Sequence, residues 1–209
     1  LSLEGVSFKD ISPISALKNI QSITLHNTSI ISIESFSNLS KVNHLSITES
    51  HSLQSVEGVE EMTKLTFLEL TDNGIVNISE LNNLVNLQTL ILNNNEIISF
   101  PNINNLVNLE TLVVRNNNIE ELGDDLSGLV NLVVFDAAHN NISDISSLGD
   151  LISIEVIDLE DNDLGKDGQS PDFRSLLNAT NLRELNLQNN GLTSISDLAG
   201  KDLSLEKLY

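Results

Sequence analysis

The chain has 209 residues, of which 40% are apolar and only 3% aromatic, and its formal net charge is −20. With 10 Lys and Arg against 30 Asp and Glu, it lacks the basic surface of a nucleic-acid-binding protein. It has no Cys to form a disulfide framework, and no apolar run of roughly 18 residues that could insert into a membrane.

One motif dominates the sequence: it repeats every 22 residues and reads L-x-x-L-x-L-x-x-N-x-L. A fixed period of this length is typical of stacked repeats that form an elongated coil. The clearest copies begin at Leu65, Leu87, Leu109, Leu132 and Ile154. Their Asn slots hold Asn73, Asn95, Asn117, Asn140 and Asn162.

Further copies precede and follow these five. They begin at Leu1 (a partial copy), Ile20, Val42, Leu182 and Leu205 (cut off at the end). The copy at Val42 has 23 residues, which predicts a bulge near His51. We expect a single domain over residues 1–209, a fragment of a longer chain with about eight full repeats and partial repeats at both ends.

Each position of the motif has a physical reason. The L-x-L pair predicts a short strand with both leucines on one face, because alternate residues of a strand point the same way. A buried Asn after the strand can bond backbone groups that neighbouring turns leave open. The first three copies hold Val6, Thr28 and Ser50 in that slot, so we expect the Asn ladder to be incomplete there.

The second half of each repeat spaces its apolar residues by three, as in Ile78, Leu81 and Leu84, which predicts a 3₁₀ turn or short helix. The copy at Ile154 is longer, with 28 residues, and its extra length lies in residues 165–173. There Ser170-Pro171-Asp172 predicts the start of an α-helix with Ser170 as N-cap. Phe173, Leu176 and Leu177 would face the core from this helix.

These residues resemble the leucine-rich-repeat family over the whole chain. Phrases such as Asp10-Ile11-Ser12-Pro13-Ile14 and Asn141-Ile142-Ser143-Asp144-Ile145 are similar to the 22-residue internalin-like and Sds22-like subclass. The resemblance implies an α/β fold: a right-handed solenoid, or horseshoe, with a concave parallel β-sheet and a convex side of 3₁₀ or short helices. It also implies protein binding. The Lys that often follows Asn in Sds22 repeats is absent, which disfavours a phosphatase regulator.

The variable positions of the strands would face the concave surface, which at roughly 4.8 Å per strand is on the order of 45 Å long. Phe67 is off the ladder, unlike the other Phe residues, and aliphatic residues follow it on later strands. An aromatic anchor among aliphatic neighbours is typical of a binding hot spot, although β-branched residues also simply favour strands. The candidate protein-binding residues are Phe67, Ile91, Val113, Arg115, Val134, Asp136, Val156, Asp158 and Glu160.

Carboxylates gather near one stretch of the predicted sheet, at Asp136, Asp158, Glu160 and Asp161, with Glu69 and Asp72 further back. A partner with a basic surface would be steered toward them. The alternative is that acidic residues only keep a long solenoid soluble.

Other sites are not expected. The acidic run from Asp161 to Asp167 lacks the acid and Gly that a calcium loop needs at its fifth and sixth positions. There is no nucleophile elbow or P-loop, and an open face offers no water-excluding cleft for general acid–base catalysis. We therefore expect no metal, no cofactor and no enzyme activity.

The sequence favours protein–protein recognition by the ligand-binding part of a bacterial surface or secreted protein. The alternative is an intracellular Sds22-like scaffold that binds a phosphatase or another enzyme, which would be cytoplasmic. In either case we expect a monomer with a protein ligand, no nucleic acid and no membrane insertion.

Overall fold

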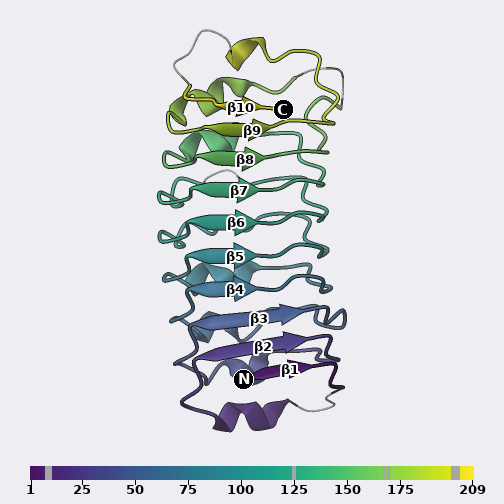
Figure 1. Ribbon diagram of the computed structural model, residues 1–209, viewed down its shortest axis with the longest axis vertical. Coiled ribbons are helices and arrows are strands. Elements are labelled where there is room, and N and C mark those ends of the chain that lie inside the picture. The colour runs from purple at the N-terminus through teal and green to yellow at the C-terminus, as the bar shows by residue number, and fades with distance from the viewer. Residues whose placement is uncertain (8–10, 124–125, 167, 169, 199–202) are drawn as a thin grey trace.

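The computed structural model describes residues 1–7, 11–123, 126–166, 168, 170–198 and 203–209. Asp10 and Asp167, which belong to motifs discussed above, lie outside the described residues. In the described part of the chain, ten strands form one sheet in the order β1 to β10, and every neighbouring pair is parallel (Figure 1). The predicted α/β solenoid with an open parallel sheet is confirmed.

Each described strand is short and is joined to the next through a return segment. The strands are β1 (Ser2–Glu4), β2 (Ser22–His26), β3 (His44–Thr48), β4 (Phe67–Glu69), β5 (Thr89–Ile91), β6 (Thr111–Val113), β7 (Val134–Asp136), β8 (Val156–Asp158), β9 (Glu184–Asn186) and β10 (Lys207–Leu208). The return segments contain the 3₁₀ helices η1 (Ser12–Ala16), η2 (Glu34–Phe36), η3 (Val59–Glu61), η4 (Ser79–Asn83), η5 (Ser146–Asp150), η6 (Phe173–Asn178) and η7 (Ser196–Leu198).

The strands stack in the register that the motif predicts. Leu68 pairs with Leu90 and Leu90 with Leu112, one motif length apart, and all three are essentially buried. The 23-residue repeat keeps this register, because Leu45 pairs with Leu68. Its extra residue is taken up after β3, in a turn that the hydrogen bond from Leu53 N–H to Ser50 O closes at 2.8 Å.

The Asn slot forms a buried hydrogen-bond ladder between turns. The Asn117 amide donates to Leu92 O of the preceding repeat at 2.9 Å and to Val114 O of its own repeat at 3.0 Å. Its Oδ1 accepts from Ile97 N–H at 3.1 Å. The same exchange with the preceding repeat recurs at Asn73, Asn95, Asn140, Asn162 and Asn190.

At the amino-terminal end, hydroxyl groups take the place of the amides. Thr28 Oγ1 and Ser50 Oγ lie 2.7 Å apart, and Thr28 N–H donates to Ser50 Oγ. Ser50 N–H in turn donates to Asn73 Oδ1. The Asn ladder is incomplete here, as expected, but buried side-chain hydrogen bonding continues through two more turns because a hydroxyl can also accept from a backbone N–H.

In each repeat, the residue directly before the Asn position of the motif has a left-handed backbone conformation. The position has a φ between +50° and +62° in every copy from Gly5 to Asn189. Gly, Asn and Asp tolerate this conformation best, and they fill most of these positions. The exceptions are Glu49 and His139. This turn points the chain away from the strand and leaves the Asn side chain beneath the preceding repeat.

The prediction of an α-helix after Ser170 was wrong. The segment is a 3₁₀ helix, η6, and its N-cap is Asp172, whose side chain accepts from Arg174 N–H at 2.9 Å. Phe173, Leu176 and Ala179 are buried while Leu177 is only half-buried. Spacing by three aligns the buried residues most closely when the helix has three residues per turn.

We expect Asn117→Ala to lower the free energy of unfolding by about 2 kcal/mol or more, because the buried Ile97 N–H and three carbonyl groups lose their hydrogen bonds to the Asn117 side chain. Chemical denaturation measures the change. Asn118→Ala is the matched control, because Asn118 is exposed and its side chain faces solvent next to the ladder. Equal stability of the two variants would contradict a structural role for the ladder.

Candidate functional site

The open face of the sheet carries the apolar residues that the sequence singled out. In β4 to β9 the middle residue of each strand is buried and the two flanking residues are half-buried. Phe67, Ile91, Val113, Val134 and Val156 all hold flanking positions. They therefore lie on the sheet face and not in the hydrophobic interior.

The strand register places these five residues in two adjacent columns. A column here is the set of residues that pair with one another from strand to strand across the sheet. Phe67 shares a column with Val134 and Val156, in which Thr89 and Thr111 intervene. Ile91 and Val113 are direct partners in the next column. The apolar residues thus form a band that steps from one column to the other and back, which we call the apolar band.

Phe67 has an aromatic partner that the sequence analysis did not name as a site. The rings of His44 and Phe67 are stacked, with centroids 4.3 Å apart and planes inclined by 10°. His44 precedes Phe67 in the same column of the register, so the repeat spacing alone could have indicated the contact. Stacking holds the Phe67 ring in one orientation on the sheet face.

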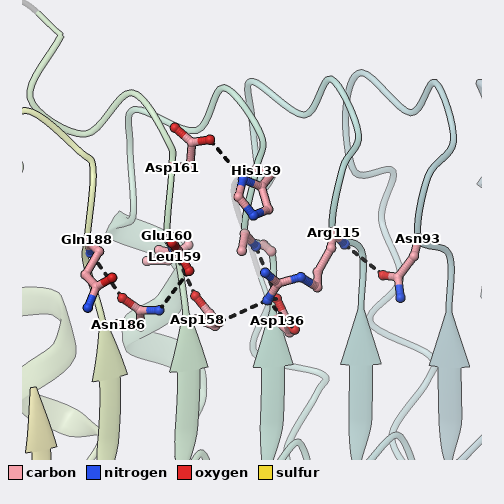
Figure 2. Close-up of polar contacts among 12 residues, drawn as sticks. Asn93, Arg115, Asp136, His139, Asp158, Leu159, Glu160, Asp161, Asn186 and Gln188 are labelled. Atoms are coloured by element: carbon pink, nitrogen blue, oxygen red, sulfur yellow. Dashed lines mark hydrogen bonds and ion pairs between the residues drawn. The ribbon is translucent and has the colours of Figure 1, made fainter. Parts of the chain in front are cut away.

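An ionic cluster lies beside Val134 and Val156 of the apolar band, because Asp136 and Asp158 continue the column of Val113 on the same two strands. Arg115 Nη1 is 3.0 Å from both carboxylate oxygens of Asp136 and 3.0 Å from Asp158 Oδ2 (Figure 2). These three side chains are between 21% and 29% exposed. One guanidinium faces two carboxylates, so the cluster keeps one net negative charge when all three groups are ionised.

Backbone hydrogen bonds orient the carboxylates of this ionic cluster. Asp136 Oδ1 accepts from Ala138 N–H at 3.2 Å, and Asp158 Oδ1 accepts from Glu160 N–H at 3.0 Å. In each case the Asp side chain at the end of a strand accepts from the backbone N–H two residues later, a local hydrogen bond that short polar side chains commonly make. The cluster is therefore fixed by the strand ends as well as by Arg115.

Burial raises the pKa of the Asp136 carboxyl above its ordinary value, and Arg115, which lowers that pKa, offsets only part of this effect. Burial also acts to lower the pKa of Arg115, but the hydrogen bonds and charges of Asp136 and Asp158 outweigh it, so the pKa of Arg115 is raised. At neutral pH an ionised Asp136 is thus held on this face at a cost in folding free energy.

The remaining acidic residues near the cluster also have partners. Glu160 Oε2 accepts a 3.4 Å hydrogen bond from Asn186, and Asp161 Oδ2 lies 2.8 Å from His139 Nδ1 (Figure 2). In the acidic run that begins at Asp161, Asn162 belongs to the buried Asn ladder and Asp163 is paired with Lys166.

The described residues contain no group of three or more His, Cys, Asp or Glu arranged to hold a metal ion. Within the same residues, no helix has the length and apolar character needed to cross a membrane.

Family models for leucine-rich repeats match three parts of the chain. A model of leucine-rich repeats in two copies matches residues 85–128, a leucine-rich-repeat model matches residues 107–164, and another matches residues 181–201. No curated protein matches the chain.

Two solved internalins from Listeria monocytogenes have a similar structure. The internalin inlF has a TM-score of 0.73 and 27% identity, over 95% of this chain and 63% of its own. The internalin C2, inlC2, has a TM-score of 0.69 and 25% identity, over 100% of this chain and 76% of its own. The chain therefore spans less than two thirds of the inlF structure.

The raised pKa of Asp136 gives the stability of the protein a pH dependence with a defined sign. Its contribution to the free energy of unfolding is full below the ordinary Asp pKa and is lost as the pH rises through the raised folded-state value. Asp136→Asn cannot ionise. We therefore expect it to gain stability relative to the wild type as the pH rises from about 3 to about 7.

Denaturant titrations of both proteins across this pH range measure the difference. If Asp136→Asn lost stability relative to the wild type as the pH rose, ionised Asp136 would stabilise the fold and the proposed balance between burial and Arg115 would be wrong.

Proposed function

Because the chain is a leucine-rich-repeat protein with an internalin-like fold, a class that binds protein ligands, we propose that its sheet face is the recognition surface. The binding residues are those of the apolar band, with Phe67 as the aromatic anchor, and those of the ionic cluster, together with Glu160. The protein acts as a binding scaffold, not as an enzyme, and binds its partner as a monomer.

The observation that carries this proposal is the apolar band itself. Five half-buried apolar side chains lie in adjacent columns on successive strands, on the side of the sheet away from the core. The fold does not need them there, since each of the strands β4 to β8 already buries its central residue. Apolar patches with an aromatic anchor and a polar rim are typical of binding hot spots.

The ionic cluster supplies the polar rim on one side of the band. Burial raises the pKa of the Asp136 carboxyl and so disfavours its charge, and a carboxyl group placed at such a cost in folding free energy supports a role in partner binding. A basic group of the partner would meet the residual negative charge of the cluster and Glu160. Such complementarity sets orientation and association rate more than affinity.

The likeness to two internalins of a bacterium supports a place on a bacterial surface or in the secreted fraction. The partner there would be a protein that reaches the sheet face from outside.

Substitutions in the apolar band should weaken recognition without unfolding the protein. We expect Phe67→Ala and Val113→Glu each to weaken partner binding by about thirtyfold, the effect of losing a hot-spot residue. The melting temperature should shift by no more than about 2 °C, because both side chains lie outside the core. Quantitative capture from cell extracts, followed by titration of the captured protein, measures the affinity.

Val76→Glu is the matched control, because Val76 is 44% exposed and lies in the return segment after β4, off the sheet face. Proteins captured by the wild type and by Val76→Glu, but by neither sheet-face variant, would support the proposal. Unchanged affinity in both sheet-face variants would refute it.

A further inference from the structure

A polar groove runs along the amino edge of the sheet, beside the aromatic pair. It encloses about 610 Å³ and reaches from Gln21, before β2, to Asn108, before β6. It therefore crosses five successive turns, or about 20 Å at about 4.8 Å per turn. Asn43 and Thr66 line it, and they directly precede His44 and Phe67 in the chain.

The charge of this groove is opposite to that of the protein. Lys41 and Lys64 line it on successive turns, and no carboxylate of the described residues does so, although the chain has three acidic residues for every basic one. Amide and hydroxyl side chains complete the lining. The groove is thus a local cationic strip on a protein with a net charge of −20.

The two ammonium groups are available to a ligand. Lys41 Nζ donates one hydrogen bond, of 2.7 Å, to Asn19 Oδ1, which leaves two of its three protons free to donate. The Lys64 ammonium has no ion-pair partner among the described residues, and both lysines are exposed. Elsewhere, by contrast, Lys166 and Lys207 are each paired with a carboxylate.

We infer that this groove binds an extended, carboxylate-bearing segment of the partner protein. The inference rests on the proposed function and adds a second contact to it. Lys41 and Lys64, about 4.8 Å apart at their backbones, would each donate to a carboxylate, and the amides of Asn43 and Gln88 would donate to the same groups. A segment of about six extended residues spans the groove.

The chemistry of the lining favours an acidic ligand over a neutral one. A neutral sugar is usually held by acceptors as well as donors, and carboxylates, the strongest acceptors, are missing from the described lining. The pair of ammonium groups instead matches acidic side chains, and the nearby Phe67 connects the groove to the apolar band.

Together, the groove and the ionic cluster would orient the partner. The lysines lie near β3 and β4, whereas Asp136 and Asp158 end β7 and β8 (Figure 1). A partner bound across both would place its acidic segment over the amino-terminal turns and its basic groups over the later ones. Reversing the partner would bring like charges together, which disfavours that orientation.

The test uses the whole chain and a fluorescent peptide of about ten residues in which Glu alternates with Ser. We expect the double variant Lys41→Gln with Lys64→Gln to bind this peptide about fivefold to tenfold more weakly than the wild type does. The double variant Lys166→Gln with Lys207→Gln makes the same change in net charge outside the groove, and should change the affinity less than about twofold. Fluorescence anisotropy at physiological salt measures both.

Equal weakening by both double variants would overturn the inference, because only the overall charge would then matter. Tighter, Lys41- and Lys64-dependent binding of a sulfated oligosaccharide would also overturn it, in favour of a glycan. If the variant with Lys41→Gln and Lys64→Gln captured the partner as well as the wild type does, the groove would not be a partner-binding site, and the proposed function would still stand. If peptide binding depended on Lys41 and Lys64 but no protein were captured in a Phe67-dependent way, the groove would stand as an acidic-peptide site and the proposed function would fall.

Discussion

The structure depends on the pairing of backbone groups between turns through a buried side-chain amide. Each turn of the coil leaves the strand through a left-handed residue, so carbonyl and N–H groups near the turn have no partner within their own repeat. The Asn ladder supplies both a donor and an acceptor to the repeat before it, at distances such as the 2.7 Å from Asn95 to Leu70 O. Because an unpaired buried polar group costs about 1–3 kcal/mol, the amides hold successive turns at one spacing.

That constant spacing turns separate residues into a surface. Side chains one repeat apart become neighbours at about 4.8 Å, so half-buried residues on short strands merge into continuous columns. Phe67 stacks on His44 and Arg115 bridges Asp136 and Asp158 only because their strands stay in register. The ladder behind the sheet and the recognition surface in front of it therefore depend on the same geometric regularity, although no residue takes part in both.

Two local patches of opposite charge lie at different strands of the sheet. The ionic cluster retains a net negative charge near β7 and β8, while Lys41 and Lys64 form a cationic strip beside β3 and β4. Because the chain has so few basic residues, a local excess of positive charge distinguishes the groove beside β3 and β4 from the ionic cluster at β7 and β8. Apolar contact between them can supply affinity, and the charges can supply orientation, because exposed ionic contacts contribute little free energy but strongly disfavour mismatched partners.

The repeat in the sequence determined the parallel sheet, its register and the buried Leu and Asn columns, because one spacing applied many times leaves a single way of stacking. It also placed Phe67, Ile91 and Val113 on the sheet face, since alternation in a strand decides the side. Only the tertiary structure decided what those residues touch. The Arg115 cluster joins residues 21 and 43 positions apart and needs side-chain reach as well as register. Likewise, local helix-start signals at Ser170 could not reveal that η6 is a 3₁₀ helix, in which Phe173 and Leu176, together with the C-cap residue Ala179, are buried at a spacing of three residues.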